Sequence, residues 1–378
     1  MKRFIIRFGL FCLPLAVLFL PVIYHLEKYR ELDSVASMAT GSRTNGSVIG
    51  LAYTDPMHLV KHAVIGELQP RIIALGSSRV LAFRSLYFDD EEGFYNCGRS
   101  VGKIQDFRAF LGSYPGEKPR LILLGLDQDF FGGDAGDADS SPRNYEEVGS
   151  SYGSRLVKGA KAFFETFKND GLVTGEVMPG AESFFGRNAR IDFEGYRPDG
   201  TYLYGRTFRV QDDYLFTSTM TRIEKGKGRF DSAEKINHGA VHELRRFVEL
   251  CAAEGIHVVA FLPPYAARVY DRLLEQRESY PHVFTLHNEL LPIFEKRGFK
   301  LFDFSDLRSV GSSDFETYDG FHASETAYLR ITEIMAESDD KLGGEVNYYT
   351  IRDLLAAPYS ARQLVEEIEE PFPMPPGL

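Results

Sequence analysis

The stretch Arg71-Ile72-Ile73-Ala74-Leu75-Gly76-Ser77-Ser78-Arg79-Val80 decides the fold class of this chain. Its apolar residues run directly into Gly-Ser-Ser, a pattern that predicts a buried parallel strand, a tight turn and a helix that begins near Arg79. Ligands of open α/β sheets bind just beyond the carboxyl ends of such strands. Ser77 and Ser78 therefore lie where a ligand can reach them, although capping the helix is an alternative use of either serine.

The same alternation of apolar strand and helix continues along the chain. Further strands are predicted at residues 93–98, 120–126, 256–262 and 300–304. Helices are predicted at residues 103–111, 232–253, 282–297 and 324–335, and Ser232 is the expected N-cap of the second. Strands that alternate with helices indicate an α/β fold with a parallel sheet.

Residues 130–231 interrupt this alternation and are predicted to form an insertion. A helix is expected at residues 154–167. An aromatic-rich stretch from Tyr196 to Tyr204 contains Asp199-Gly200, and Asp-Gly between such runs is typical of a β-hairpin. Surface insertions at strand ends often carry substrate contacts.

The N-terminal segment indicates a membrane anchor. Met1-Lys2-Arg3 precedes an apolar run over residues 4–26, which is long enough to span a bilayer. The cluster of basic residues at its start predicts a cytoplasmic N-terminus and an extracytoplasmic location for the rest of the chain. Residues 1–27 are thus interpreted as a signal anchor and residues 28–65 as a tether containing one short helix before the first strand. A cleaved signal peptide is the competing interpretation.

Composition narrows the possible partners. The chain has 378 residues and a formal net charge of −11, which argues against nucleic acid. Cys97 and Cys251 lack metal-type spacing, and the sequence leaves open whether they form a disulfide. His238 and His242 are four residues apart on a predicted helix, but no third ligand accompanies them, so neither a metal ion nor another cofactor is expected.

Ser78, Asp319 and His322 form the candidate catalytic set. A serine hydroxyl becomes a nucleophile when a base takes its proton, and the base needs a third group that fixes its tautomer. Ser78 and His322 both fall at predicted carboxyl ends of strands. Asp319 lies three residues before His322, where its carboxylate can orient the imidazole.

Four short segments carry a resemblance to the SGNH/GDSL hydrolases. Gly76-Ser77-Ser78-Arg79 resembles the first block, with Ser78 as the nucleophile, and Asp319-Gly320-Phe321-His322 matches the D-x-x-H block. Asn96-Cys97-Gly98-Arg99-Ser100-Val101-Gly102 resembles the second block, whose glycine donates a backbone N–H to the oxyanion. Gly125-Leu126-Asp127-Gln128 lies where the third block, G-x-N-D, is expected.

The resemblance implies a three-layer α/β/α, flavodoxin-like domain over residues 66–340, followed by a tail over residues 341–378. It is closest to membrane-anchored, extracytoplasmic members that work beside membrane-bound O-acyltransferases on cell-surface polymers. The implied function is acyl transfer or ester hydrolysis on a surface glycan, through an acyl-enzyme on Ser78. The alternatives are a plain lipase or esterase and a non-catalytic domain that binds a glycan or an acyltransferase.

Two positions depart from the family's blocks. Ser77 replaces the aspartate of G-D-S, and Asp127 stands where an asparagine would donate to the oxyanion. A carboxylate beside a developing oxyanion is repulsive, which predicts weak hydrolysis of simple esters. Arg79 could bind an anionic substrate, although an arginine on the helix face is the alternative interpretation.

Overall fold

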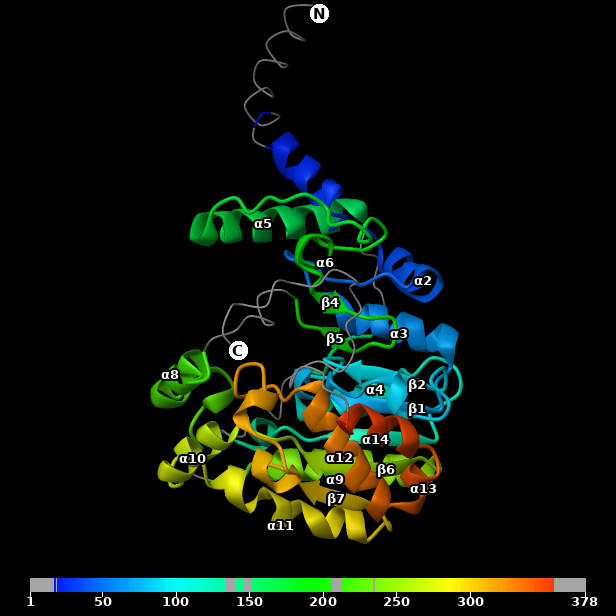
Figure 1. Ribbon diagram of the computed structural model, residues 1–378, viewed down its shortest axis with the longest axis vertical. Helices are drawn as coiled ribbons and strands as arrows, with labels where there is room; N and C mark the ends of the chain where they lie inside the picture. The colour runs from blue at the N-terminus through cyan, green and yellow to red at the C-terminus, as the bar shows by residue number, and fades with distance from the viewer. Residues whose placement is uncertain are drawn as a thin grey trace, which may run out of the picture. The chain divides into compact units, whose positions relative to one another are not determined.

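The computed structural model describes residues 17, 19–132, 141–145, 151–205, 213–233 and 235–356 (Figure 1). Its internal contacts divide the chain into two compact units. We call the first the N-terminal unit, which comprises Met1–Gln69, Ala109–Glu117 and Arg143–Val210. We call the second the sheet unit, which comprises Pro70–Arg108, Lys118–Pro142 and Gln211–Leu378.

A five-stranded parallel sheet forms the centre of the sheet unit. Its spatial order is β2 (Phe94–Gly98), β1 (Ile72–Gly76), β3 (Leu121–Gly125), β6 (His257–Leu262) and β7 (Lys300–Asp303). All five predicted strands are confirmed, and so is the α/β class. Counted along the chain, this is the doubly wound order 2-1-3-4-5, which changes direction between β1 and β3. Ligands bind at such a switch point, outside the carboxyl ends of the two strands.

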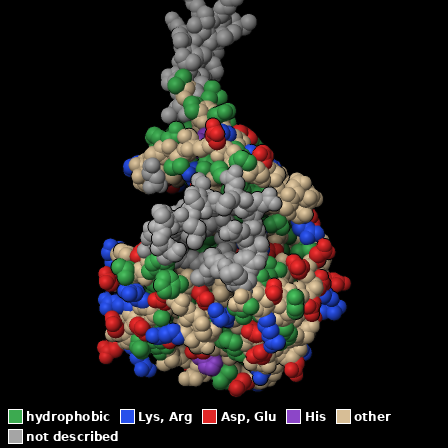
Figure 2. All heavy atoms as spheres, viewed as in Figure 1, with side chains coloured by type: hydrophobic (Ala, Val, Ile, Leu, Met, Phe, Trp, Pro, Cys, Tyr) green, Lys and Arg blue, Asp and Glu red, His purple; other side chains and the backbone are tan. Residues whose placement is uncertain are grey.

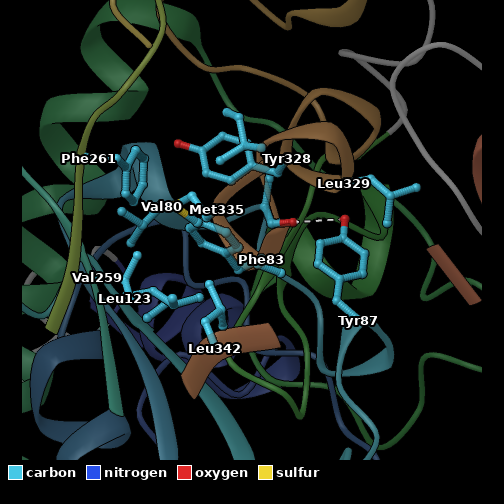
Figure 3. Packing of buried hydrophobic residues seen from close by; sticks show 14 of the residues in the cluster. Val80, Phe83, Tyr87, Leu123, Val259, Phe261, Tyr328, Leu329, Met335 and Leu342 are labelled. Atoms are coloured by element: carbon cyan, nitrogen blue, oxygen red, sulfur yellow. Dashed lines mark hydrogen bonds between the residues drawn. The ribbon is translucent and has the colours of Figure 1, made fainter. Parts of the chain in front are cut away.

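Helices contribute to the hydrophobic core around the sheet. Alternate residues of β1, β3 and β6 pack with α12 (Glu325–Ser338), α13 (Asp340–Gly343) and α14 (Tyr348–Ala356) in one core cluster, part of which Figure 3 shows. The intervening strand residues point to the other face. α9 (His238–Ala253) contacts β6, and its Phe247 packs against Phe107 of α4 (Ile104–Gly112). This arrangement is consistent with three α/β/α layers.

A second, smaller core cluster supports the loops beyond the carboxyl ends of the strands. It contains Phe216, at the start of α8 (Thr217–Lys225), and Val269 and Leu273 of α10 (Ala267–Glu275). It also contains Val283 of α11 (Pro281–Glu295) and Phe321, the residue before His322.

Two helix starts differ from the sequence predictions. The helix expected from Arg79 is only a 3-10 turn, η1 (Ser78–Val80), followed by a second turn, η2 (Ser85–Tyr87). The buried Asn96 amide donates to the carbonyls of Val80 and Phe83, so these carbonyls are used outside any helix. The helix expected from Ser232 begins at His238, because Asn237 caps it by accepting the N–H groups of Gly239 and Ala240.

The N-terminal unit contains folded elements where a tether was expected. α2 (Val35–Asn45) lies where only a tether was expected, whereas α3 (Met57–Leu68) confirms the short helix predicted before the first strand. α2 is capped by Ser34 and buries an apolar face that includes Val35, Met38 and Ala39. Burial of this face explains why the segment is ordered, whereas its Ser, Thr and Gly content had suggested an extended chain.

Part of the predicted insertion folds together with the N-terminal segment. Ile49 forms bridges to Phe185 and Tyr196, and the buried Lys61 ammonium donates to the Gly200 carbonyl. The expected hairpin is present as antiparallel β4 (Gly195–Tyr196) and β5 (Tyr202–Leu203). α5 (Tyr152–Asp170) and α6 (Arg187–Asp192) also belong to this unit.

The Glu31 carboxylate connects the N-terminal segment to the part of the predicted insertion that folds with it. It accepts the backbone N–H groups of Ala52, Tyr53 and Arg187. Burial raises its pKa to about 7 despite these donors. A buried carboxylate with three backbone donors fixes the local chain geometry as a cap does at a helix end.

Most of the predicted anchor, residues 1–16 and 18, lies outside the described residues, as does the tail beyond residue 356. Within the part of the chain that is described, no helix is both long and apolar enough to cross a membrane.

We expect Phe261→Ala to destabilise the sheet unit by about 3–5 kcal/mol, because Phe261 is fully buried in β6 and its ring packs against Phe83, Phe304 and Tyr328. Urea unfolding followed by tyrosine fluorescence measures the change. The control Tyr349→Ala removes a ring that is 81% exposed and should change the free energy of unfolding by less than about 0.5 kcal/mol. Equal effects of the two variants would contradict this core assignment.

Candidate active site

The structure brings Ser78, His322 and Asp319 together beyond the carboxyl ends of the strands. Ser78 Oγ lies 2.9 Å from His322 Nε2. His322 Nδ1 lies 3.0 Å from Asp319 Oδ2 and 3.2 Å from Asp319 Oδ1. With the imidazole proton on Nδ1, Nε2 accepts the serine proton and the carboxylate accepts the N–H. All three residues are partly exposed, so a substrate can reach this chain of hydrogen bonds.

The D-x-x-H loop fixes the position of the imidazole. Asp319 Oδ1 also accepts the backbone N–H groups of Phe321 and His322, at 2.9 and 2.8 Å. Burial alone would raise the pKa of Asp319, but His322 and these donors hold it well below its usual value. Asp319 is therefore ionised at neutral pH and can stabilise an imidazolium.

Gly320 is required by the shape of this loop. Its φ of +80° lies in the left-handed region that favours glycine. A Cβ at this position would lie 2.8 Å from side-chain atoms of both Phe216 and Val269. The loop therefore reaches its observed conformation through a residue with no side chain.

Ser77 connects the first and third sequence blocks. Its hydroxyl accepts the N–H of Arg79 as the cap of η1, and donates to Asp127 Oδ2 at 2.5 Å. Asp127 is fully buried, and its Oδ1 has no hydrogen-bond partner in the described part of the chain. The N-cap alternative thus holds for Ser77, whereas the Ser78 hydroxyl is directed to His322.

Arg79 is not available to bind an anionic substrate, which corrects that interpretation. Its side chain is 2% exposed. The guanidinium donates to Gln128 Oε1 and to the carbonyls of Pro263 and Pro264. It also lies over the rings of Tyr265 and Phe321, at 4.3 and 4.5 Å from their centres. Its role is to position the loops around the site.

The two glycines considered as oxyanion donors already use their N–H groups. The Gly98 N–H donates to Asn96 Oδ1 and the Gly102 N–H donates to Asp106 Oδ2, each at 2.8 Å. An amide engaged in this way must break a hydrogen bond before it can stabilise an oxyanion. The N–H of Ser78 is a better candidate, because the first N–H of a helical turn has no acceptor within the turn.

Asp129 and Arg229 form an ion pair close to the third block. Asp129 lies on η3 (Gln128–Phe131), and its Oδ2 is 2.7 Å from Arg229 Nη1 of η5 (Gly228–Phe230). Burial and the neighbouring Asp127 raise the pKa of Asp129 to about 6, although Arg229 opposes the shift. Arg229 was not identified from the sequence, because no motif marks the end of the insertion.

A cavity of about 220 Å³ lies at this edge of the sheet unit. Residues that line it include Gly102 and Lys103 after β2, Asp129 and Phe130 after β3, and Arg229. Strand β1, which carries Ser78 at its end, lies between β2 and β3. The cavity is therefore lined by the loops that follow the strands on either side of β1, although Ser78, Asp319 and His322 are not among its lining residues. Its lining offers charged groups together with one aromatic side chain.

The remaining sequence candidates lie outside this arrangement. His238 and His242 belong to α9, and the described residues contain no group of three or more His, Cys, Asp or Glu side chains that could hold a metal ion. Cys97 and Cys251 are both buried and are not joined by a disulfide. Comparison of the chain with protein-family models, curated proteins and solved structures finds no match.

We expect Ser77→Asp to destabilise the protein by about 3–5 kcal/mol, because it places a second carboxylate beside the buried Asp127. Ser77→Asp combined with Asp127→Asn should recover at least about 2 kcal/mol, since the pair then has one carboxylate as acceptor and one amide as donor. A double-mutant cycle of urea unfolding measures the coupling. Additive effects, within about 0.5 kcal/mol, would mean that the two side chains do not interact.

The raised pKa of Asp129 predicts a pH dependence of stability. The folded protein retains a proton between pH 3.8, the value for an unfolded aspartate, and about 6. The free energy of unfolding should therefore fall as pH rises through this window, by about 3 kcal/mol for a shift of about two units. The free energy of unfolding of the wild type minus that of Asp129→Asn should therefore be larger at pH 4 than at pH 7. A difference between the two proteins that does not change with pH would contradict the raised pKa.

Proposed function

We propose that the sheet unit is an SGNH-type acyltransferase or ester hydrolase that works through an acyl-enzyme on Ser78. The observation that carries this proposal is the continuous set of hydrogen bonds from Ser78 through His322 to Asp319. The strand order supports it as well, because the serine lies at the switch point of a doubly wound sheet.

The proposed reaction has two steps. His322 Nε2 takes the proton of Ser78 as Oγ attacks the acyl carbonyl, and the tetrahedral intermediate then expels the leaving alcohol, to which His322 returns the proton. In the second step His322 deprotonates the acceptor hydroxyl or water that attacks the acyl-enzyme. Asp319 stabilises the imidazolium in both steps, and the backbone N–H of Ser78 is the proposed donor to the oxyanion.

We further propose that the acceptor is a surface glycan that enters the cavity lined by Asp129, Phe130 and Arg229. Charged and amide groups suit hydroxyl-rich ligands, and an aromatic ring suits the apolar face of a sugar. The basic residues before the apolar run at residues 4–26 support a single membrane span and an extracytoplasmic sheet unit. A membrane-bound O-acyltransferase as partner rests on the family resemblance alone.

A non-catalytic binding domain is the second candidate function. The engaged N–H groups of Gly98 and Gly102 favour it, as does the carboxylate at position 127, because all three weaken an oxyanion site. Such a domain would keep the cavity for its ligand and the three side chains as structural remnants.

Labelling with a fluorophosphonate distinguishes the two candidates. An activated serine displaces fluoride and forms a phosphoryl ester, so the wild type should be labelled at Ser78. Ser78→Ala and His322→Ala should each abolish labelling, and Asp319→Asn should slow it by as much as about 10⁴-fold. The exposed Ser313 provides a control, because Ser313→Ala should be labelled at the wild-type rate.

The three substitutions act on one unit, so the double variant Ser78→Ala/His322→Ala should support no less glycan acylation than either single variant. A folded Ser78→Ala protein that fully supports the acylation in cells would contradict the enzymatic proposal and favour the binding domain.

A further inference from the structure

Exposed hydrophobic side chains are concentrated in two segments of the N-terminal unit. Of the fourteen large hydrophobic side chains that are exposed in the described residues, four lie in residues 17–24 and five in residues 152–173. Figure 2 shows hydrophobic side chains gathered where the described chain begins. A concentration of this kind on a folded surface marks a binding site for a protein or a membrane.

The two segments contact each other. Residues 19–28 are helical, and the ring of Phe19 packs edge-on against Phe164 of α5, with centres 6.0 Å apart. Three residues further along, Val22 is buried in a cluster with Phe163 of α5 and Leu26. Figure 1 shows α5 crossing the helix at the start of the described chain.

This packing limits where a membrane span can lie. The apolar run covers residues 4–26, but Val22 and Leu26 are 3% and 0% exposed, so protein and not lipid covers them. The part of the apolar run that remains available to contact lipid therefore ends near residue 21. This leaves about 18 residues, which is still enough for a span. The surface of the bilayer then falls at the level of Phe19 and its contact with α5.

One stripe of α5 combines apolar and basic residues. Val157, Lys161, Phe164 and Lys168 follow one another at spacings of four, three and four, so they share one face of the helix. Val157 is 71% exposed and the Lys161 side chain is 78% exposed. Because Phe164 contacts Phe19, this face of α5 is directed toward the helix of residues 19–28.

The charge of α5 differs from that of the whole chain. α5 carries four basic and two acidic residues, whereas the chain has a net charge of −11. An amphipathic helix with lysines beside large apolar side chains is typical of segments that lie in the head-group region of a bilayer. Anionic lipids attract such lysines.

We propose that the face of α5 formed by Val157, Lys161, Phe164 and Lys168 lies in the interface of a bilayer that contains anionic phospholipids. The proposal rests on the proposed membrane span and adds a second contact to it. It explains why an exposed Val157 and exposed lysines share one helix face beside the end of the apolar run. α5 then fixes how deeply the N-terminal unit sits at the membrane.

The test uses the full chain in vesicles of phosphatidylcholine with phosphatidylglycerol. An environment-sensitive fluorophore is attached at Val157→Cys in a Cys12→Ser background, in which the other two thiols, those of Cys97 and Cys251, are buried. Lipids that carry a nitroxide near the head group should quench this probe by about twofold or more. The matched control is Leu274→Cys on α10 of the sheet unit, a position that is 47% exposed, where quenching should stay near the background.

Charge reversal tests the role of the lysines. Lys161→Glu with Lys168→Glu should reduce quenching at position 157, and the reduction should disappear in vesicles of phosphatidylcholine alone. Flotation of the labelled protein with the vesicles reports on the membrane span separately. Protein that floats while its Val157 probe stays unquenched would overturn the proposal for α5 and leave the span intact. Protein that does not float would overturn both. Fluorophosphonate labelling of Ser78 depends on neither result.

Discussion

The buried guanidinium of Arg79 is the contact on which the geometry of the candidate site depends. Arg79 follows β1, and its hydrogen bonds reach Gln128 after β3 and the carbonyls of Pro263 and Pro264 after β6. Its planar face lies against Phe321, in the loop that carries His322. One side chain thus joins the ends of three strands to the D-x-x-H loop. Ser78 and His322 are 244 residues apart in sequence, and each is the chain neighbour of a residue in this contact.

Burying this guanidinium has an electrostatic cost that the surrounding residues offset. A buried charge is tolerated only when other charges and hydrogen bonds compensate it. Two carboxylates lie nearby. Asp129 interacts electrostatically with Arg79, and Asp127 interacts with Asp129 and with Tyr265, the residue over whose ring the guanidinium lies. Asp127 has Ser77 as its hydrogen-bond donor, and Asp129 has Arg229. The carboxylate at position 127 therefore has a structural function of its own, because it accepts the hydroxyl of Ser77, the residue that caps the turn carrying Ser78 and Arg79.

The sequence predicted the sheet well because four of its five strands, β1, β2, β3 and β6, are buried throughout. β1, β3 and β6 appear as short apolar runs that end in polar residues, and the spacing of Asp319 and His322 is local enough to be recognised directly. Arg79 was misjudged because a contact spread over four loops leaves no local pattern. α2 was missed because Ser, Thr and Gly interrupt its apolar residues and because its contact with α3 leaves no local pattern. The use of the Gly98 and Gly102 N–H groups depends on side chains whose orientation only the structure gives.

The same geometry affects whether the proposed enzyme would pass its acyl group to water or to the hydroxyl of a bound acceptor. Each oxyanion donor that is lost lowers the rate by about 10²–10³, and this chain has two engaged amides and one carboxylate where donors are expected. Such a site forms and consumes an acyl-enzyme slowly when the attacking molecule is unassisted water. An acceptor hydroxyl that is bound against the acyl-enzyme gains from proximity, which is worth far more than one donor. In the proposed enzyme, a weak oxyanion site would therefore favour transfer to a bound hydroxyl over hydrolysis.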